Sequence, residues 1–457
     1  MSWRVWKIHE RKDTKQVLVL LWSSSGQLIV IFKHNQESPQ SLEYQIYTDL
    51  CALTDDTPTS FFPTKDAIQR AVVHAVESAR PYGDEIIQQP LELEKALQIG
   101  TENGITNASI IELSDEFTAF CSLLKQPSDL LDRRSSVTPD IVEQRHVHFQ
   151  EPFKSYRGAC TKVSLKDQHE FFVFKGVSFF DYLRLGPSSF QYHLAASYRE
   201  IQMINTILPK HPNIMPPPKA FVTVNPTTDA SAKHLVSGSV YPIYKNGSLA
   251  AVLNESREKR TRIPLSRKVK WCSQLASVLY HVHSVARSWH QDLKPPNMLL
   301  DDADNILVID WEKCGANSFI LAPEANGEFD VEADTEETEG RRKLRYKAYN
   351  GPERVSDPIA VPKWNVFPVW NEKYPEAVEL AEIYSLGKTT WLILEQVSTG
   401  HGGEDYSSEV VQWSEWSEDI PQSWKDIVDR CIKADPNERT RVGELCRFWE
   451  DELKKYG

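Results

Sequence analysis

The pattern of apolar and polar positions predicts strands and helices from the start of the chain. Branched apolar residues fill Val17–Trp22 and Gln27–Phe32, and the Ser-Ser-Ser-Gly sequence between them is typical of a turn, so a β-hairpin is predicted. Thr64 is suited to cap a helix whose apolar residues recur on one face. A further helix is predicted to begin at Ser114, with an inner face formed by Phe117, Phe120, Cys121 and Leu124.

These patterns indicate that residues 1–125 form a small α+β domain. No combination of residues in it points to chemistry, so its candidate roles are regulation, binding of a regulatory partner and scaffolding. The next segment, residues 126–148, is predicted to be a linker. Its charged residues are interrupted by prolines and serines, at Pro127, Ser128, Ser135, Ser136 and Pro139.

Strand-like and helical patterns alternate after residue 149. Phe171–Phe174 is a strand-like run that ends at Lys175, and Ile306–Ile309 predicts a buried strand that ends at Asp310. A helix is predicted around Glu200, preceded by an extra turn, from residues at helical spacing: Leu194, Tyr198, Ile201, and Met203 or Ile204. Another helix is predicted from Val269, Cys272, Leu275, Leu279 and Val282.

Composition and charge narrow the class of protein. A chain of 457 residues has room for two or three domains, and its net charge of −12 argues against general nucleic-acid binding but not against ATP. Its seven cysteines form no Cys-x-x-Cys pair, which predicts reduced thiols without a zinc site or disulfide frame. The early apolar run Val17–Trp22 is too short for a signal core or a membrane span. We therefore expect an intracellular protein, cytoplasmic or nuclear.

The candidate chemistry lies between His290 and Asp310. The sequence from His290 reads His-Gln-Asp-Leu-Lys-Pro-Pro-Asn, and Ile-Asp-Trp-Glu ends the predicted buried strand. Asp292 is able to accept a proton from an attacking hydroxyl group, whereas Asn297 and Asp310 offer the hard oxygen ligands that Mg²⁺ prefers. This combination predicts phosphoryl transfer from a nucleotide.

The His-x-Asp-Leu-Lys-x-x-Asn sequence and the Asp that follows the strand resemble the catalytic and metal-binding loops of the eukaryotic protein kinase superfamily. The resemblance covers roughly residues 149–452, and the chain is similar to a divergent, fungal-type Ser/Thr protein kinase. It implies an α+β, bilobal kinase-like domain over residues 149–455, preceded by the small α+β domain. The small β-rich lobe would span about 149–241, and the large helical lobe about 245–455.

The resemblance also implies a role for each matching residue. Asp292 is expected to be the catalytic base, with Lys294 as a second catalytic residue beside it. Lys175 is expected to contact the α and β phosphates of ATP and to pair with Glu200, and the Mg²⁺ ligands are expected to be Asn297 and Asp310. The other positions assigned to ATP binding are Gly158, Val163, Tyr241, Pro242 and Tyr244.

Several residues depart from the family's pattern. The phosphate loop keeps one glycine, Gly158, and Trp311-Glu312 replaces the usual Phe-Gly. Gln291 stands where many kinases have an Arg that helps to bind a loop phosphate, so activity is expected not to depend on activation-loop phosphorylation. The activation segment ends at either Glu324 or Glu353, and Arg439 is expected to pair with whichever of the two closes it.

Two further expectations concern the insert and the choice of function. An acidic run and then a basic run between residues 328 and 345 predict a mobile loop, either solvated or acting as a self-masking flap. Asp310-Trp311-Glu312 also fits small-molecule kinases of the aminoglycoside-phosphotransferase or choline-kinase type, but Lys294-Pro295 and Asp435–Arg439 fit them less well. A nucleotide-binding pseudokinase that binds partners is a third possibility. The preferred prediction is ATP- and Mg²⁺-dependent phosphorylation of protein Ser/Thr hydroxyls, with a substrate that the sequence does not name.

Overall fold

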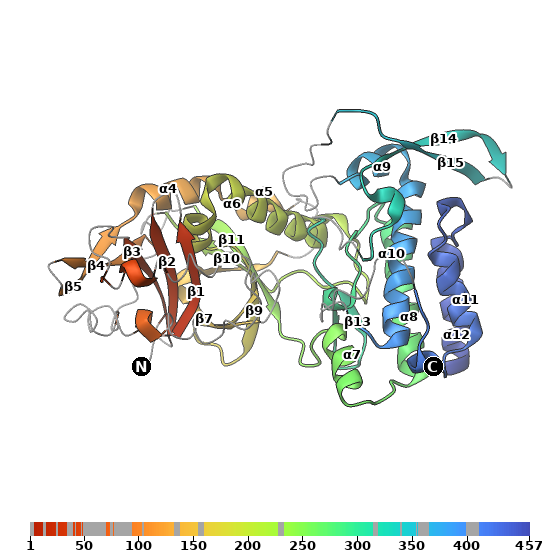
Figure 1. Ribbon diagram of the computed structural model, residues 1–457, viewed down its shortest axis with the longest axis horizontal. Coiled ribbons are helices and arrows are strands. Elements are labelled where there is room, and N and C mark those ends of the chain that lie inside the picture. The colour runs from red at the N-terminus through yellow and green to blue at the C-terminus, as the bar shows by residue number, and fades with distance from the viewer. Residues whose placement is uncertain are drawn as a thin grey trace. The chain divides into compact units, whose positions relative to one another are not determined.

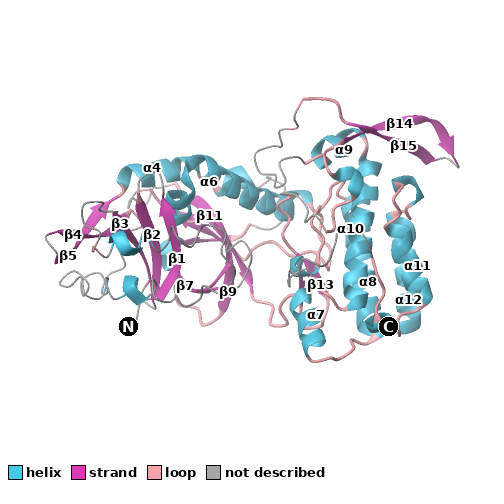
Figure 2. Ribbon diagram, viewed as in Figure 1, coloured by secondary structure: helices cyan, strands magenta, loops and turns pink. Residues whose placement is uncertain are grey.

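The chain is an α+β protein made of two compact units (Figures 1 and 2). The first unit contains Met1–Leu130, Thr138–Ser197 and Pro218–Ile243, and the second contains Leu131–Val137, Tyr198–Pro217 and Tyr244–Gly457. The structure, a computed structural model, describes residues 4–11, 15–23, 26–33, 40–41, 43–46, 48, 70–73, 76, 94–102, 105–131, 138–153, 160–226, 233–313, 319–338, 341–352, 354, 365–398 and 411–457.

The first unit begins with a five-stranded sheet in the order β1-β2-β3-β4-β5. Its strands are β1 (Arg4–Arg11), β2 (Gln16–Ser23), β3 (Gly26–Lys33), β4 (Lys95–Glu102) and β5 (Ile105–Glu112). β2 and β3 pair antiparallel with Val17 opposite Phe32, which confirms the predicted hairpin. β3 pairs in parallel with β4, after a long connection. The described part of that connection is helical at residues 70–73 and 76, and its Val72 and Val76 are buried against the sheet.

The predicted helix at Ser114 is confirmed as α4 (Ser114–Leu123), with Phe117, Phe120 and Cys121 buried. The helix predicted from Thr64 is only partly described, since most of its residues lie outside the described ranges. The described helical residues and α4 both present apolar side chains at helical spacing, which accounts for their burial.

A six-stranded sheet forms the other half of the first unit, in the order β6-β10-β11-β9-β8-β7. Its strands are β6 (Asp140–Glu143), β7 (Val147–Pro152), β8 (Cys160–Leu165), β9 (Phe171–Gly176), β10 (Ala220–Val224) and β11 (Leu235–Pro242). The strand predicted to end at Lys175 is confirmed as β9. The prediction of a linker over 126–148 is wrong in part, because α5 (Pro127–Leu130), β6, η1 (Gln144–His146) and the start of β7 lie there. β6 gains its pairing from the distant strand β10, which local composition does not reveal.

Helix α6 (Phe179–Gln202) follows β9 and is longer than the sequence predicted, since it begins within the expected extra turn. Gly186, at φ 71°, kinks it before Pro187, and its C-terminal end continues into a π-turn, η2 (Met203–Ile207). α6 joins the amino-terminal residues to the second sheet within the first unit. Asp181 accepts a hydrogen bond of 2.9 Å from Lys7 of β1, and the ring centroids of Phe179 and Phe117 are 5.2 Å apart.

The pairing of β9 with β11 requires glycine at Gly238, which lies opposite Gly176. A Cβ atom on Gly238 would lie 2.6 Å from the backbone oxygen of Lys175, where no room exists. We expect Gly238→Ala to lower the free energy of unfolding by roughly 1–3 kcal/mol, because the strand that carries Lys175 must shift. Urea unfolding would measure the loss. Gly100→Ala in β4 is the matched control, because a Cβ there meets nothing within 4 Å; an equal loss in both variants would contradict this explanation.

The second unit is mainly helical. Its helices are α7 (Leu249–Glu258), α8 (Leu265–Ser284), α9 (Phe367–Lys373), α10 (Pro375–Glu395), α11 (Gln422–Cys431) and α12 (Val442–Tyr456). In Figure 2, α8, α10, α11 and α12 run alongside one another. α10 is buried along almost its whole length, so it forms the centre of this core. The helix predicted from Val269 to Val282 is confirmed as α8, with all five predicted apolar residues buried.

A small antiparallel pair, β12 (Met298–Leu300) and β13 (Ile306–Val308), follows α8 and confirms the predicted buried strand. Residues 198–217 also belong to this unit and contact β13, although they lie about 90 residues earlier in the chain. The Val308 amide donates to the Asn213 carbonyl oxygen at 2.8 Å, and the Asn213 side chain donates to the Ile306 carbonyl oxygen at 2.8 Å. Asn213 therefore fixes the edge of β13.

The acidic and basic runs, which were predicted to be a mobile loop, instead form a hairpin of β14 (Phe329–Thr338) and β15 (Arg341–Ala348). Opposite charges face each other in its register: Asp330 lies opposite Lys347, and Glu332 opposite Arg345. Val331 and Leu344 are buried on the other face in a core shared with α9 and α10. Alternation along each strand, rather than charge alone, was the signal for this hairpin.

The structure bears on the expected absence of a membrane span and on the expected state of the cysteines. Among the described residues, no helix is both long enough and apolar enough to cross a membrane. The described cysteines, which are Cys121, Cys160, Cys272, Cys431 and Cys446, have free thiols. Cys51 and Cys314 lie outside the described residues.

Candidate functional site

The loop from His290 to Asn297 is held by one buried carboxylate of the central helix α10. Glu382 is fully buried and accepts hydrogen bonds from the backbone amides of His290, at 2.8 Å, and Gln291, at 2.6 Å. His283 of α8 contacts the other carboxylate oxygen of Glu382 at 2.7 Å. Because two contacts come from consecutive amides of the loop and the third from α8, Glu382 fixes the backbone of the loop relative to α8 and α10.

Asp292, Lys294 and Asn297, three residues predicted from the sequence, lie together in this loop. The Asp292 carboxylate is 2.7 Å from the Lys294 ammonium group and accepts a hydrogen bond of 3.0 Å from the Asn297 side chain. The same Asn297 amide also donates to the Asp292 carbonyl oxygen at 2.9 Å. Thr389 of α10 donates to the Leu293 carbonyl oxygen at 2.5 Å. Lys294 and Asn297 therefore both contact one oxygen of the Asp292 carboxylate, Oδ2.

Asp310 lies two residues after the end of β13 and beside this loop. The Ile309 amide donates to the Asn297 carbonyl oxygen at 3.0 Å, and His290 Nε2 contacts the Ile309 carbonyl oxygen at 2.9 Å. Burial lowers the pKa of His290, which favours a neutral ring whose Nδ1 accepts from the Asp292 amide. Gln291 and Asp310 have φ values of 79° and 69°, a strained backbone region that is typical of functional sites.

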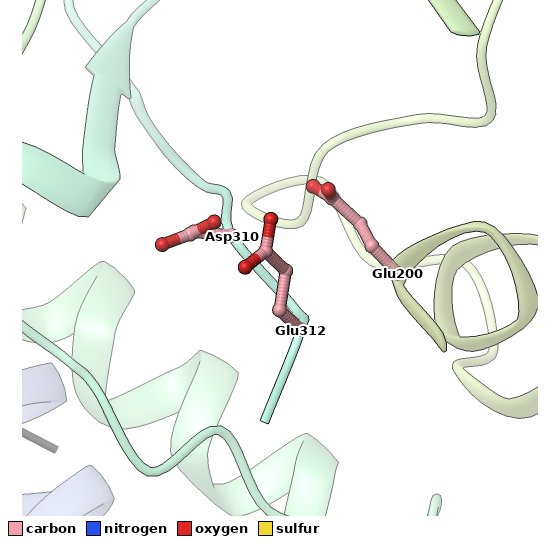
Figure 3. Close-up of side chains that lie close together, drawn as sticks. All are labelled: Glu200, Asp310 and Glu312. Carbon is pink, nitrogen blue, oxygen red and sulfur yellow. The ribbon is translucent and has the colours of Figure 1, made fainter. Parts of the chain in front are cut away.

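Glu200, Asp310 and Glu312 form a cluster of three carboxylates (Figure 3). One oxygen of each lies within 4.8 Å of the others, and Glu200, at the end of α6, is buried. Hard oxygen donors of this kind suit a divalent cation such as Mg²⁺, although carboxylates also cluster without one. Glu312 was not among the predicted metal ligands; the Ile-Asp-Trp-Glu sequence was the signal that could have added it.

The remaining predicted residues fall in both units. In the first, Lys175 ends the apolar run of β9 opposite Ser239, Val163 is fully buried in β8, and Tyr241 and Pro242 end β11. Tyr244 belongs to the second unit, where burial raises the pKa of its hydroxyl group. Gly158 lies outside the described residues.

The structure decides which carboxylate pairs with Arg439. Arg439 Nη2 donates to Glu324 at 2.9 Å, and a second guanidinium nitrogen contacts the other carboxylate oxygen. Both side chains are buried, and Arg439 also donates to the Leu380 carbonyl oxygen at 3.0 Å. Glu353, the alternative partner, lies outside the described residues. Glu324 precedes β14, so the charged hairpin follows Glu324 in the sequence.

Lys313 is a buried lysine near the site that the sequence did not single out. Burial lowers the pKa of its amine to about 7, although Glu382 acts in the opposite direction. The amine donates to Ser288 Oγ at 2.6 Å and lies 3.6 Å from the centre of the Trp289 ring. It packs the segment after Asp310 against the residues just before His290.

Acid should weaken the fold through Glu382. Burial alone would raise the pKa of this carboxyl, but hydrogen bonds from His283 and from Gln291 hold it below its ordinary value of 4.5. A lowered pKa stabilises the fold above pH 4.5, and this contribution is lost as the pH falls through the folded-state pKa. We expect Glu382→Gln to lose roughly 1.5–3 kcal/mol at pH 7, because charged hydrogen bonds are removed.

The loss in Glu382→Gln should shrink towards lower pH, which urea unfolding at a series of pH values would measure. Glu376→Gln, on the exposed first turn of the same helix, is the control and should change stability by less than about 1 kcal/mol. A difference between wild type and Glu382→Gln that stays constant from pH 7 to acid would contradict the assigned ionisation.

Neither the models of known protein families nor the curated proteins match this chain. Its chemistry is therefore argued from its own residues. The arrangement offers a fixed carboxylate with a lysine beside it, an adjacent amide, and a carboxylate cluster next to the same loop. Such a set suits proton acceptance from a hydroxyl group close to a polyanionic, metal-bound substrate.

Proposed function

We propose that this protein is a kinase-like enzyme that transfers the terminal phosphoryl group of ATP to Ser or Thr hydroxyls of proteins. The observation that carries the proposal is the Asp292 carboxylate, fixed by Lys294 and Asn297 in a loop whose backbone is anchored on buried Glu382. That geometry fits a base that must meet a hydroxyl in one orientation. The strained backbone at Gln291 and Asp310 supports it.

In this proposal each residue has a distinct task. Asp292 accepts the proton of the attacking hydroxyl, and Lys294 places positive charge beside the transferring group. Asn297 and Asp310 are the proposed Mg²⁺ ligands, and bound Mg-ATP supplies the phosphoryl group and neutralises its charge. Lys175 is proposed to contact the α and β phosphates. Glu200 orients the phosphate-binding residues, and adenine and ribose contacts are assigned to Gly158, Val163, Tyr241, Pro242 and Tyr244.

Phosphorylation of proteins is preferred over that of small molecules because of Arg439. The sequence Asp435–Arg439 resembles a late protein-kinase motif whose Arg pairs with a Glu, and Arg439 does pair with buried Glu324. One observation favours the small-molecule alternative: Glu312 joins Asp310 in the carboxylate cluster, as the Ile-Asp-Trp-Glu sequence of those enzymes would require. Radiolabelled phosphate transfer to a generic protein substrate, compared with transfer to an aminoglycoside and to choline, separates the two.

Binding of Mg-ATP is the first expectation to test. At a hundred times its dissociation constant, Mg-ATP should stabilise the fold by about 2.7 kcal/mol, seen as a rise in melting temperature. Lys175→Met should reduce that rise, because a phosphate contact is lost. Lys162→Met, on the neighbouring strand β8 with its amine over the Phe171 ring, is the control. An unchanged melting temperature at millimolar Mg-ATP would favour a protein that binds partners without turning over nucleotide.

A further inference from the structure

Gln291 and Asn365 form a reciprocal pair of side-chain amides. Gln291 Nε2 donates to Asn365 Oδ1 at 2.9 Å, and Asn365 Nδ2 donates back to Gln291 Oε1 at 3.0 Å. Gln291 is buried and directly precedes Asp292. A paired donor and acceptor on each side chain permits one relative orientation, which a single hydrogen bond would not impose.

Asn365 has other partners in the second unit. Its Oδ1 accepts from the Phe367 amide at 3.1 Å at the start of α9, and its Nδ2 approaches the Lys313 carbonyl oxygen at 3.4 Å. Lys313 stands shortly after Asp310. One short side chain therefore joins the loop of Asp292, the segment after Asp310 and the first turn of α9.

The contact with Asn365 helps to hold the strained backbone of Gln291 in place. Its φ of 79° is unfavourable for a residue other than glycine and persists only where the surroundings enforce it. Two groups enforce it here. Glu382 holds the Gln291 amide from one side, and Asn365 holds its side chain from the other. Without Asn365, the Glu382 hydrogen bond would be the remaining one of these two restraints on Gln291, so the strained backbone of residues 291–293 would open more often.

We propose that Asn365 is a positioning residue that sets the orientation of Asp292 through Gln291. This inference rests on the proposed phosphoryl transfer and deepens it. The Gln291–Asn365 pair consists of uncharged amides. It therefore forms without any phosphate on the chain, and ionic strength has little effect on it. The loop is therefore held in its working geometry from the start, and phosphorylation of the chain adds nothing to the rate.

The test compares four variants in steady-state phosphoryl transfer. Asn365→Ala and Gln291→Ala should each lower kcat roughly tenfold and leave the KM for ATP within about twofold, since neither residue is proposed to touch ATP. The double variant should be no slower than the slower single variant, because both substitutions break the same contact. Asn371→Ala is the matched control: it lies on α9 and donates instead to the Arg287 carbonyl oxygen. Its kcat should not change.

Two further measurements separate this inference from the activity itself. Hydrogen exchange of the backbone amides of residues 291–293 should be faster in Asn365→Ala than in wild type or Asn371→Ala, whether or not transfer is detected. Phosphatase-treated wild type should keep its full rate. Losses that multiply in the double variant, unchanged exchange in Asn365→Ala, or a rate that falls on phosphatase treatment and returns on rephosphorylation would each overturn the proposal. Wild type without transfer activity, but with the expected exchange result, would count against the kinase function and leave the positioning contact in place.

Discussion

Replacing Asp292 by Asn is expected to lower the rate of phosphoryl transfer by about 10²–10⁴-fold. Asn cannot accept the proton of the attacking hydroxyl, although its shape is the same and it can keep a contact with Asn297. ATP binding should be almost unchanged, because the base contacts the hydroxyl and not the nucleotide. Single-turnover transfer and the Mg-ATP melting shift, measured on the same preparation, would separate the two effects.

The control for this substitution is Asp302→Asn, which changes an exposed carboxylate a short distance along the chain. It should transfer phosphate at the rate of the wild type. Full activity in Asp292→Asn would show that another group accepts the proton, and the assignment of the whole loop would fail with it.

Replacing Arg439 by Met is expected to destabilise the fold by about 3–5 kcal/mol, because Glu324 would be left as an unpaired buried charge. The hydrogen bonds from Arg439 to the Leu380 and Lys433 carbonyl oxygens would also be lost. Urea unfolding followed by tryptophan fluorescence would measure the change. Among the substitutions considered above, this is the largest stability loss that we expect.

The double variant Arg439→Met with Glu324→Leu tests the cause. Removing both charges avoids the unpaired carboxylate, so the double variant should be more stable than Arg439→Met alone. Additive losses would instead show that Arg439 acts mainly through packing and backbone contacts. Arg447→Met on exposed turns of α12 is a control for loss of a guanidinium group and should change stability by about 0.5 kcal/mol or less.

Local patterns predicted the parts of the fold whose residues are neighbours in sequence. The hairpin of β2 and β3, the start of α4 at Ser114, the buried face of α8 and the strand before Asp310 each follow from spacing within a few residues. Asp292, Lys294 and Asn297 were singled out as residues of one short loop, but the contacts between their side chains were not predicted.

The missed features depend on partners that are distant in the chain. β6 becomes a strand because β10 pairs with it, and the charged insert is ordered because Val331 and Leu344 reach a core built mainly by α9 and α10. Asn365 gives no signal in the sequence, since its importance comes only from meeting Gln291. Glu382 is one of several acids in the sequence of α10, and nothing near it in the chain indicates its three contacts.

Residues 198–217 belong to the second unit but are synthesised before the rest of it, apart from residues 131–137. They must therefore wait for their partners while the chain is being made. Asn213 is synthesised 93 residues before Ile306, whose carbonyl oxygen it must meet. At ribosomal rates of roughly 5–20 residues per second, that is a delay of about 5–20 seconds. During this time the residues of the first unit that follow, Pro218–Ile243, are already available to pair. A fragment that begins at Tyr244 would lack the strand-edge partner of Val308, so we expect it to fold less stably than its helical content alone would suggest.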